Sequence, residues 1–289
     1  MKGIILAGGS GSRLYPITKG VSKQLIPIND KPMIYYPLSV LMEGNIKDVL
    51  IISTPDDIES YKRLLGDGSL LGMNISYKIQ PSPDGLAQAF VLGKNFIGNE
   101  SVCLILGDNV FCGNKVSNLI LDSINIVEKE NKSNIFGYKV KDPERYGVAE
   151  FDKNMNILSV EEKPKNPKSN YAIVGLYCYP NNVVNKVNEV VPSKRGELEI
   201  TSLNDLYLKE SALKIKLLED DFFWLDTGTH ESLIEASNFV RTIENRENKK
   251  IACIEEISFK KGWISRDKLM ENIRKLGENQ YSKYLKKLL

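Results

Sequence analysis

The chain contains 289 residues, of which 39 are basic, 37 are acidic and one is a histidine, so its net charge at pH 7 is +2. This balance lacks the basic footprint of a nucleic-acid-binding protein, and no apolar run approaches the roughly 20 residues that span a membrane. The single histidine, His230, excludes a histidine-rich zinc site, and no G-x-S-x-G motif accompanies it as in many serine hydrolases.

The first predicted element is a buried strand over residues 2–7, which leads directly into a glycine-rich loop. The loop reads Gly8-Gly9-Ser10-Gly11-Ser12-Arg13, and Lys23 follows ten residues later. Glycines let consecutive backbone N–H groups face an anion, and arginine and lysine both suit phosphate oxygens. The pattern predicts a binding site for a triphosphate or pyrophosphate. A plain turn between strand and loop is the alternative.

Two commoner phosphate loops do not match this segment. A P-loop needs G-x-x-x-x-G-K-[ST], whereas Lys19 precedes Gly20 here. A dinucleotide-binding loop needs a third glycine where Leu14 stands, and Pro16 would break the helix that should follow. A nicotinamide-dependent oxidoreductase is therefore disfavoured.

Strand and helix patterns then alternate through the first half, which indicates a parallel α/β sheet. Strands are predicted over residues 48–53, 74–79 and 102–106, and helices over residues 33–44, 56–65, 85–95 and 114–129. Residues 134–180 are rich in strand-like runs.

The last part of the chain is predicted to be helical. The residues Leu233, Ala236, Val240 and Ile243 would share one helix face. Residues 265–289 carry two further short amphipathic helices, which we expect to pack on the body of the protein.

Two aspartates follow apolar runs in positions that suit a ligand. Asp108 comes just after the strand at 102–106, and the carboxyl ends of such strands form the ligand crevice of open α/β sheets. Asp226 follows Trp224 and Leu225 and precedes a predicted helix. Two carboxylates could hold a Mg²⁺ ion that also binds phosphates. Each aspartate could instead cap a helix or lie in a turn.

Charged residues at the end of the strand-rich region are candidates for binding a phosphorylated sugar. Glu162 and Lys163 end a predicted strand before Pro164, so Lys163 could reach a phosphate and Glu162 a sugar hydroxyl. Arg195 is a second candidate phosphate ligand. A solvated charged face and a surface arginine are the alternatives.

These motifs, in this order, resemble the sugar nucleotidyltransferase family, and within it the short glucose-1-phosphate thymidylyltransferases. Runs 80–89 and 224–229 are the most specific to the thymidylyl branch. The matching runs span the whole chain and are residues 3–13, 22–27, 30–38, 65–69, 80–89, 107–109, 142–148, 161–164, 195–201 and 224–229.

The resemblance implies roles by position, with Gln80 and Gly85 reading the base. The implied nucleotide-binding residues are Gly8, Gly9, Ser10, Gly11, Ser12, Arg13, Lys23, Gln24, Gln80, Gly85 and Asp108. The implied sugar-phosphate-binding residues are Asn109, Gly147, Glu162, Lys163, Ile173 and Arg195. Mg²⁺ would be held by Asp108 and Asp226. The implied catalytic residues are Arg13, Lys23, Asp108, Lys163 and Asp226.

The implied reaction transfers dTMP from dTTP to α-D-glucose 1-phosphate and releases pyrophosphate, as the first step toward dTDP-rhamnose or another deoxysugar. The attacking phosphate oxygen is already ionised, so no general base is needed. The implied fold is Rossmann-like, with a mostly parallel mixed sheet flanked by helices, inserted sugar-binding strands and a helical C-terminal part. Residues 1–289 would form one domain, with a nucleotide-binding core (1–130), a sugar-phosphate part (131–228) and C-terminal helices (229–289).

The resemblance further implies a homotetramer that a dTDP-sugar inhibits at a second site. The four cysteines form no C-x-x-C pair and no signal-peptide pattern precedes the first strand, so we expect buried free thiols and a cytoplasmic protein. Use of UTP or another sugar phosphate stays an alternative, since a pocket gains only ~1–3 kcal/mol from one thymine methyl. A non-catalytic protein that senses a sugar nucleotide is a more remote alternative.

Overall fold

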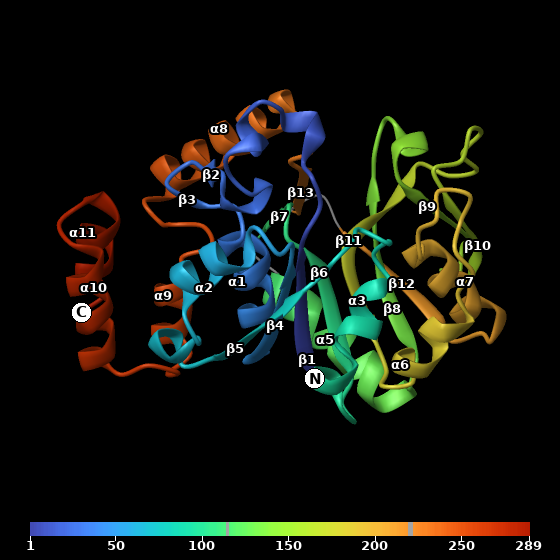
Figure 1. The fold of residues 1–289 in the computed structure, drawn as a ribbon, viewed down its shortest axis with the longest axis horizontal. Coiled ribbons are helices and arrows are strands. Elements are labelled where there is room, and N and C mark those ends of the chain that lie inside the picture. Colours follow the sequence, from blue (N-terminus) through green and yellow to red (C-terminus); the bar gives the residue numbers. More distant parts are fainter. Residues whose placement is uncertain (114–115, 219–221) are drawn as a thin grey trace.

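One mixed sheet forms the centre of the protein in this computed structural model, which describes residues 1–113, 116–218 and 222–289 (Figure 1). Nine strands of the described residues belong to it, in the order β10-β9-β11-β6-β1-β4-β5, with β8 beside β11 and β12 beside β8. These strands are β1 (Lys2–Ala7), β4 (Asp48–Ser53), β5 (Asn74–Ile79), β6 (Val102–Leu106), β8 (Ser133–Lys139), β9 (Gly147–Phe151), β10 (Ile157–Glu162), β11 (Tyr171–Tyr179) and β12 (Leu213–Leu217).

The first half of the chain supplies four neighbouring parallel strands of this sheet, and β12 pairs in parallel with β8 at another place in it. Strand β1 lies between β4 and β6 and runs parallel to both, so that Ile5 pairs with Ile51 and with Ile105. Strand β11 is antiparallel to β6 and joins the second half of the chain to the same sheet. The predictions of a parallel α/β core and of a mixed sheet are therefore confirmed.

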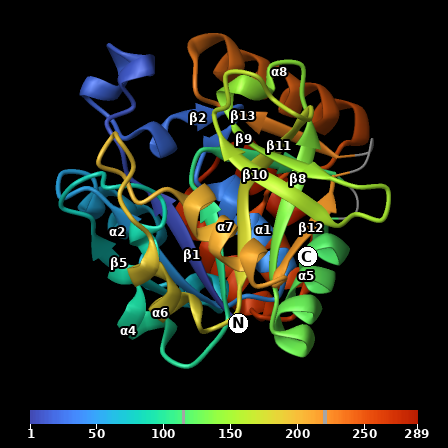
Figure 2. The same cartoon turned by 90° about the vertical axis from the view of Figure 1, so that its right-hand side faces the viewer.

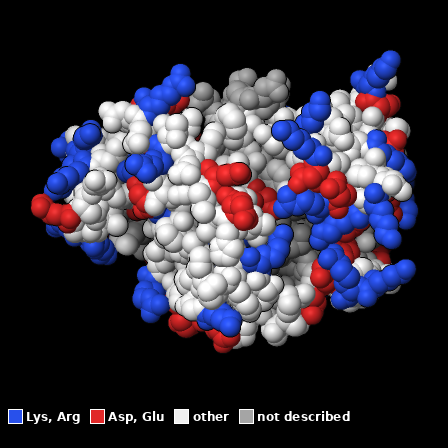
Figure 3. All heavy atoms as spheres, turned by 90° about the horizontal axis from the view of Figure 1, so that it is seen from above, with Lys and Arg blue, Asp and Glu red and all other residues white. Residues whose placement is uncertain are grey.

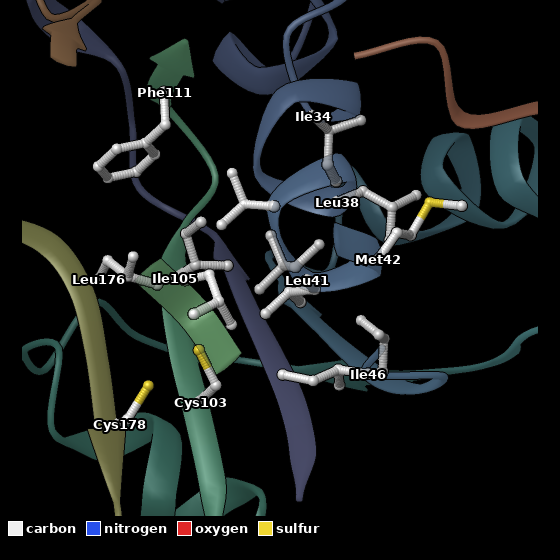
Figure 4. Packing of buried hydrophobic residues seen from close by; sticks show 14 of the residues in the cluster. Ile34, Leu38, Leu41, Met42, Ile46, Cys103, Ile105, Phe111, Leu176 and Cys178 are labelled. Carbon is white, nitrogen blue, oxygen red and sulfur yellow. The ribbon is translucent and has the colours of Figure 1, made fainter. Parts of the chain in front are cut away.

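Both faces of the sheet are buried, because helices cover each of them. Successive side chains of a strand point to opposite faces, so Ile5 and Ile105 belong to one cluster while Ile4 and Leu104 belong to the other. Figure 4 shows the first cluster, in which Leu41 lies near the strands. The flanking helices are α1 (Tyr35–Glu43), α2 (Ile58–Leu65), α3 (Gln88–Leu92), α4 (Lys94–Ile97), α5 (Val116–Glu130), α6 (Val183–Lys186) and α7 (Ile200–Lys209).

The helix predicted over residues 85–95 is two short helices, α3 and α4, which meet at Gly93. A Cβ atom at Gly93 would lie 2.9 Å from Ile4 Cδ1, so this glycine lets the chain approach β1 closely at the cost of an interrupted helix. The helix predicted over 114–129 begins at Val116, and residues 114–115 lie outside the described part of the chain.

Two small ladders lie beside the main sheet. Strand β7 (Asn109–Cys112) pairs antiparallel with β13 (Phe223–Asp226), and β2 (Pro27–Ile28) pairs with β3 (Lys31–Pro32). Figure 2 views the molecule from the side of β9, β10 and α7, with α8 behind and above them. The ladder β7–β13 continues the chain past β6 toward the crevice at the carboxyl ends of the parallel strands.

The C-terminal part is helical, as predicted, with α8 (His230–Glu247), α9 (Ile254–Lys260), α10 (Arg266–Leu276) and α11 (Gln280–Lys286). Leu233, Ala236 and Val240 of α8 are buried against Ile28, while Ile243 is half-buried. Helices α10 and α11 pack beside each other at one end of the molecule (Figure 1). Within the described ranges, no helix is both long and apolar enough to cross a bilayer.

Candidate active site

The glycine-rich loop leaves β1 without forming an α-helix. The only helices in residues 8–34, all of which are described, are single turns of 3₁₀-helix, as the break at Pro16 predicts. Gly9 (φ 99°) and Gly11 (φ 57°) adopt left-handed backbone that favours glycine. A Cβ atom at Gly8 would lie 2.5 Å from Oε1 of Gln80, so a side chain there would displace this amide. The loop therefore keeps its exposed backbone open to a ligand.

Lys23, the cation behind this loop, forms a salt bridge with the predicted metal ligand Asp108. Its Nζ lies 2.5 Å from Oδ2 of Asp108, and only 8% of the lysine side chain is exposed. Burial alone would raise the pKa of the Asp108 carboxyl, but the charge of Lys23 and hydrogen bonds to the carboxylate outweigh this and lower it. Asp108 is thus held ionised next to a cation.

Asn109 is the hydrogen-bonding centre of the site. Its Oδ1 accepts from the indole N–H of Trp224 at 2.6 Å and from the backbone N–H of Gly175 at 3.1 Å. Its Nδ2 donates to Oδ1 of Asp108 at 3.0 Å. The amide of Asn109 therefore orients Asp108, and its predicted contact with a sugar phosphate stays a prediction.

The β7–β13 ladder brings the second predicted metal ligand to the first. Asp226 pairs with Asn109 across this ladder, one residue from Asp108. Burial and the neighbouring charge of Asp108 raise the pKa of the Asp226 carboxyl, against the opposing effect of Lys23 and Arg13. Two carboxylates that repel each other in a half-closed site are what a divalent cation would stabilise.

Arg13 points toward the same place from the glycine-rich loop. A Cβ atom at Gly228 would lie only 3.1 Å from its Nη2, so the missing side chain at 228 makes room for the guanidinium. Arg13 and Asp226 line the same cavity. Ser12, Arg13, Asp108 and Asp226 are called the loop wall below.

The opposite wall carries charges of both signs. Arg195 Nη2 lies 2.9 Å from Glu199, 3.3 Å from Glu197 and 3.9 Å from Glu162. Lys163 Nζ lies 3.7 Å from Glu162, whose Oε2 accepts from the hydroxyl of Thr201 at 2.6 Å. Glu199 in turn raises the pKa of Arg195 by its hydrogen bond.

Lys163 has an unusual backbone conformation. Its φ of 44° lies in the left-handed region, which non-glycine residues seldom adopt. Its N–H donates to the carbonyl of Tyr146 at 3.0 Å, which holds this turn at the end of β10. We call Gly147, Glu162, Lys163 and Arg195 the strand wall.

The two walls enclose one cavity of about 750 Å³, within the usual size of a ligand site. Seen from above, charged side chains of both signs gather around a hollow in the right half of the molecule (Figure 3). The predicted site residues that line the cavity are Ser12, Arg13, Asp108, Asn109, Gly147, Glu162, Lys163, Ile173, Arg195 and Asp226.

Other predicted residues lie outside the lining of this cavity. Lys23 contacts it only through Asp108. Gln24 lies under the glycine-rich loop, where its Oε1 accepts from Ser22 and Tyr61 and its Nε2 donates to the Gly8 carbonyl at 3.4 Å. Gly8, Gly9, Ser10 and Gly11 precede the cavity residues along the loop, and the assigned nucleotide contacts of all these residues stay predictions.

The segment predicted to read the base is fastened to the strand wall. Gly85 (φ 105°) packs against Leu198, whose backbone nitrogen would lie 2.5 Å from a Cβ atom at position 85. The Leu198 N–H donates to the Asp84 carbonyl at 2.7 Å, and the Ala87 N–H donates to the Leu198 carbonyl at 3.1 Å. The loop 81–87 and the segment before α7 are therefore one connected unit.

Sequence reasoning assigned no role to several residues that line the cavity. Five such residues are Arg145, Tyr146, Thr201, Glu199 and Trp224. These five residues lie in the runs that carry the family resemblance. Their closeness in sequence to residues with an assigned role was the only sequence feature that could have identified them. Trp224 additionally packs edge-to-face on Tyr146, with ring centroids 5.2 Å apart, and forms the apolar floor.

Across the parts of the chain that the structure describes, no three His, Cys, Asp or Glu side chains gather as a metal site. A metal held by Asp108 and Asp226 would need its other ligands from substrate phosphates and water, which is the usual coordination of Mg²⁺. The donor set of two carboxylates beside a phosphate-binding loop therefore fits this ion.

Comparison with known proteins identifies the family of this chain. Residues 2–243 match the family model described as nucleotidyl transferase. A glucose-1-phosphate thymidylyltransferase of Neisseria meningitidis is 55% identical over 289 residues, which is 100% of this chain and 99% of that protein.

Solved structures agree. A Bacillus anthracis protein described as a glucose-1-phosphate thymidylyltransferase, crystallised with a sucrose, has a TM-score of 0.75 at 41% identity, covering 83% of this chain and 95% of that one. A UDP-glucose pyrophosphorylase complexed with UDP-glucose has a TM-score of 0.71 at 26% identity, covering 84% and 98%.

Proposed function

This chain belongs to the nucleotidyl transferase family, among the glucose-1-phosphate thymidylyltransferases, and we propose how its site performs that reaction. The chain transfers dTMP from dTTP to α-D-glucose 1-phosphate, giving dTDP-glucose and pyrophosphate. The observation that carries this proposal is the single cavity between the loop wall and the strand wall, since it offers one set of charges to each substrate. Such a reaction supplies the first intermediate of a deoxysugar route.

The loop wall would bind the nucleotide. The N–H groups of Gly8 to Ser12 would surround the triphosphate, while Arg13 and Lys23 would neutralise charge on the transferring and leaving phosphates. Gln80 and Gly85 would contact the base. In this assignment residues 1–130 form the nucleotide-binding core and residues 229–289 support it from outside.

The strand wall would bind the sugar phosphate. Lys163 and Arg195 would contact its phosphate, and Glu162 would accept from a sugar hydroxyl, with Gly147, Ile173 and Asn109 shaping the subsite. Arg195 is already held among three carboxylates, so its guanidinium is positioned before the phosphate arrives. This assigns residues 131–228 to the sugar-phosphate part.

Asp108 and Asp226 would hold Mg²⁺, which supplies charge neutralisation on the substrate phosphates when bound. The chain's own contribution is to bring two carboxylates together across the β7–β13 ladder and to hold Asp108 in place through Asn109. Lys23, bonded to Asp108, keeps that carboxylate ionised and ready to coordinate a cation.

Catalysis then depends on position and charge. The glucose 1-phosphate oxygen is ionised at neutral pH, so it attacks the α-phosphorus of dTTP without a base, in line with the departing pyrophosphate. The P–O bond to the sugar phosphate forms as the bond to pyrophosphate breaks. Arg13, Lys23, Lys163 and Arg195 offset the repulsion between the two anionic substrates.

A UTP-using enzyme is the second candidate. The structural similarity to a UDP-glucose pyrophosphorylase complexed with UDP-glucose favours it. An oxidoreductase is disfavoured by the turns of 3₁₀-helix that stand where a dinucleotide-binding helix would begin.

Three further features are part of the proposal. A homotetramer and inhibition by a dTDP-sugar follow from the family resemblance. A separate cavity of about 360 Å³, lined by Val40, Phe111, Phe239 and Lys250, offers a place for such an inhibitor. Four buried free cysteines suit the reducing cytoplasm, where we place the protein.

The decisive assay is pyrophosphate release from the purified protein with Mg²⁺ and glucose 1-phosphate, across dTTP, UTP, CTP, ATP and GTP, with an EDTA control. Preference for dTTP that EDTA abolishes supports the proposal. Preference for UTP would change the nucleotide assignment and keep the mechanism. Product binding without turnover would favour a sensor.

A further inference from the structure

Gln80 begins a chain of three polar side chains beside the glycine-rich loop. Its Nε2 donates to Oε1 of Gln88 at 2.7 Å, and Nε2 of Gln88 donates to Oδ2 of Asp84 at 2.7 Å. Gln80 follows β5 and is buried, Asp84 lies in the loop after it, and Gln88 is the first residue of α3. Neither Asp84 nor Gln88 has a role in the mechanism described above.

The chemistry of a carboxylate fixes the orientation of both amides. An ionised carboxylate only accepts hydrogen bonds, so Gln88 must turn its NH₂ group toward Asp84 and its carbonyl oxygen toward Gln80. Gln80 must then donate its own NH₂ group to Gln88. A glutamine amide can adopt two orientations of similar shape that differ by exchange of its oxygen and nitrogen. Here the carboxylate of Asp84 determines the orientation of Gln88, and Gln88 determines that of Gln80.

The outcome is that Gln80 presents its carbonyl oxygen to Gly8 of the glycine-rich loop. This Oε1 lies where the missing side chain of Gly8 would be, because a Cβ atom there would come within 2.5 Å of it. Gly8 is the first residue of the glycine-rich loop after β1. The oxygen is therefore a buried, oriented acceptor next to the phosphate-binding backbone.

We propose that Asp84 and Gln88 are positioning residues that make the nucleotide site select bases with an imide N–H, thymine or uracil, over cytosine. The inference rests on the proposed function, in which Gln80 contacts the base. Thymine and uracil offer an N–H donor at N3, which an amide oxygen accepts. Cytosine has a lone pair at N3. This lone pair would repel the Gln80 oxygen, and both acceptors would lack a hydrogen-bond donor.

The test compares kcat/KM for dTTP and dCTP, measured by pyrophosphate release with glucose 1-phosphate. In Asp84→Lys the ammonium would donate to Gln88 Oε1 and reverse both amides, so that Gln80 presents its NH₂ group. We expect the dTTP/dCTP ratio to fall about 100-fold, since a site built around one hydrogen bond discriminates strongly against its mismatch. Asp84→Asn permits both orientations and should lower the ratio roughly 10-fold.

Ser82→Ala is the matched control. The Ser82 hydroxyl donates to the same Asp84 oxygen at 2.6 Å but does not contact either glutamine. Its removal leaves the carboxylate and both amides in place, so the ratio should stay within about twofold of the unaltered protein. Melting temperatures establish that each variant is folded.

The results separate this inference from the proposed function. If the unaltered protein prefers dTTP and folded Asp84→Asn and Asp84→Lys keep the same ratio, the positioning role is overturned. Equal losses with both nucleotides would also overturn it, because a merely structural contact lowers both. If the unaltered protein releases no pyrophosphate from dTTP, the proposed function fails. In that case the affinities of the same variants for dTDP and dCDP, measured by calorimetry, test the inference. The ratio of the two affinities should change as predicted for the kcat/KM ratio.

Discussion

The two walls of the cavity hold their charges in different ways. Behind the loop wall, Lys23 and Asp108 form one short contact in which the side chains are 8% and 23% exposed. On the strand wall, Arg195 is 47% exposed and lies within 4 Å of three carboxylates. Solvent screens the exposed set much more than the buried pair. Because the loop wall would contact the transferring and leaving phosphates and the strand wall the sugar phosphate, we expect changes to the loop wall to slow the chemical step and changes to the strand wall to weaken binding.

The largest effect should come from Asp226→Asn, which removes one of the two carboxylates proposed to hold Mg²⁺. We expect kcat to fall about 10³-fold at saturating Mg²⁺, because a metal supplies several kcal/mol of charge stabilisation. The melting temperature should be unchanged or higher, since the variant no longer buries a charge near Asp108. Asp205→Asn, in an exposed pair with Lys209, is the control. Near-normal turnover would refute the metal assignment.

Arg13→Ala should lower kcat about 10²-fold, the scale of losing one preorganised donor to developing charge. Lys19→Ala removes an exposed cation from the same loop and should change kcat little. Steady-state kinetics with dTTP varied would separate the two outcomes. A change confined to KM would instead make Arg13 a residue that binds substrate and transition state equally.

On the strand wall, Arg195→Ala should raise KM for glucose 1-phosphate roughly 10-fold and lower kcat only about threefold, because its charge is largely solvent-screened. The KM of the unaltered protein should also rise with ionic strength. Arg195→Lys keeps the charge and should recover part of the affinity. If kcat fell as far as in Arg13→Ala, the contrast between the two walls would be wrong.

The smallest effect concerns stability and pH in the metal-free protein. The folded state raises the pKa of Asp226 above its ordinary value of 3.8, so folded molecules bind this proton more tightly than unfolded ones. The contribution of Asp226 to the unfolding free energy must therefore fall as pH rises from 3.8 through the raised pKa. Denaturant titrations should show a shallower loss in Asp226→Asn over that window. Identical pH profiles would show that Asp226 is not perturbed.

Local patterns were sufficient to predict the parallel strands. The ranges 2–7, 48–53, 74–79 and 102–106 agree with β1, β4, β5 and β6, because most of these runs are apolar and lie between neighbours in the sheet. The prediction of one continuous helix over 85–95 was wrong at Gly93. The interruption there depends on packing against Ile4, which is distant in sequence.

The site was harder to predict for the same reason. Asp108 and Asp226 were identified from the apolar runs before them, but their meeting depends on the β7–β13 ladder, which no local pattern indicates. The contact of Asn109 with a sugar phosphate stays a prediction, whereas its hydrogen bonds to Trp224 and Gly175 come from strands distant in sequence, which no local pattern indicates. The left-handed conformation of Lys163 likewise could not be predicted, because lysine seldom adopts it.

The β7–β13 ladder has a consequence for how the protein is made. It joins two segments more than a hundred residues apart, so a nascent chain on the ribosome exposes the phosphate loop long before the second carboxylate is synthesised. We expect chains released before β13 to lack activity, because they lack one of the two carboxylates proposed to hold Mg²⁺. Activity would therefore be observed only in chains whose synthesis has passed residue 226.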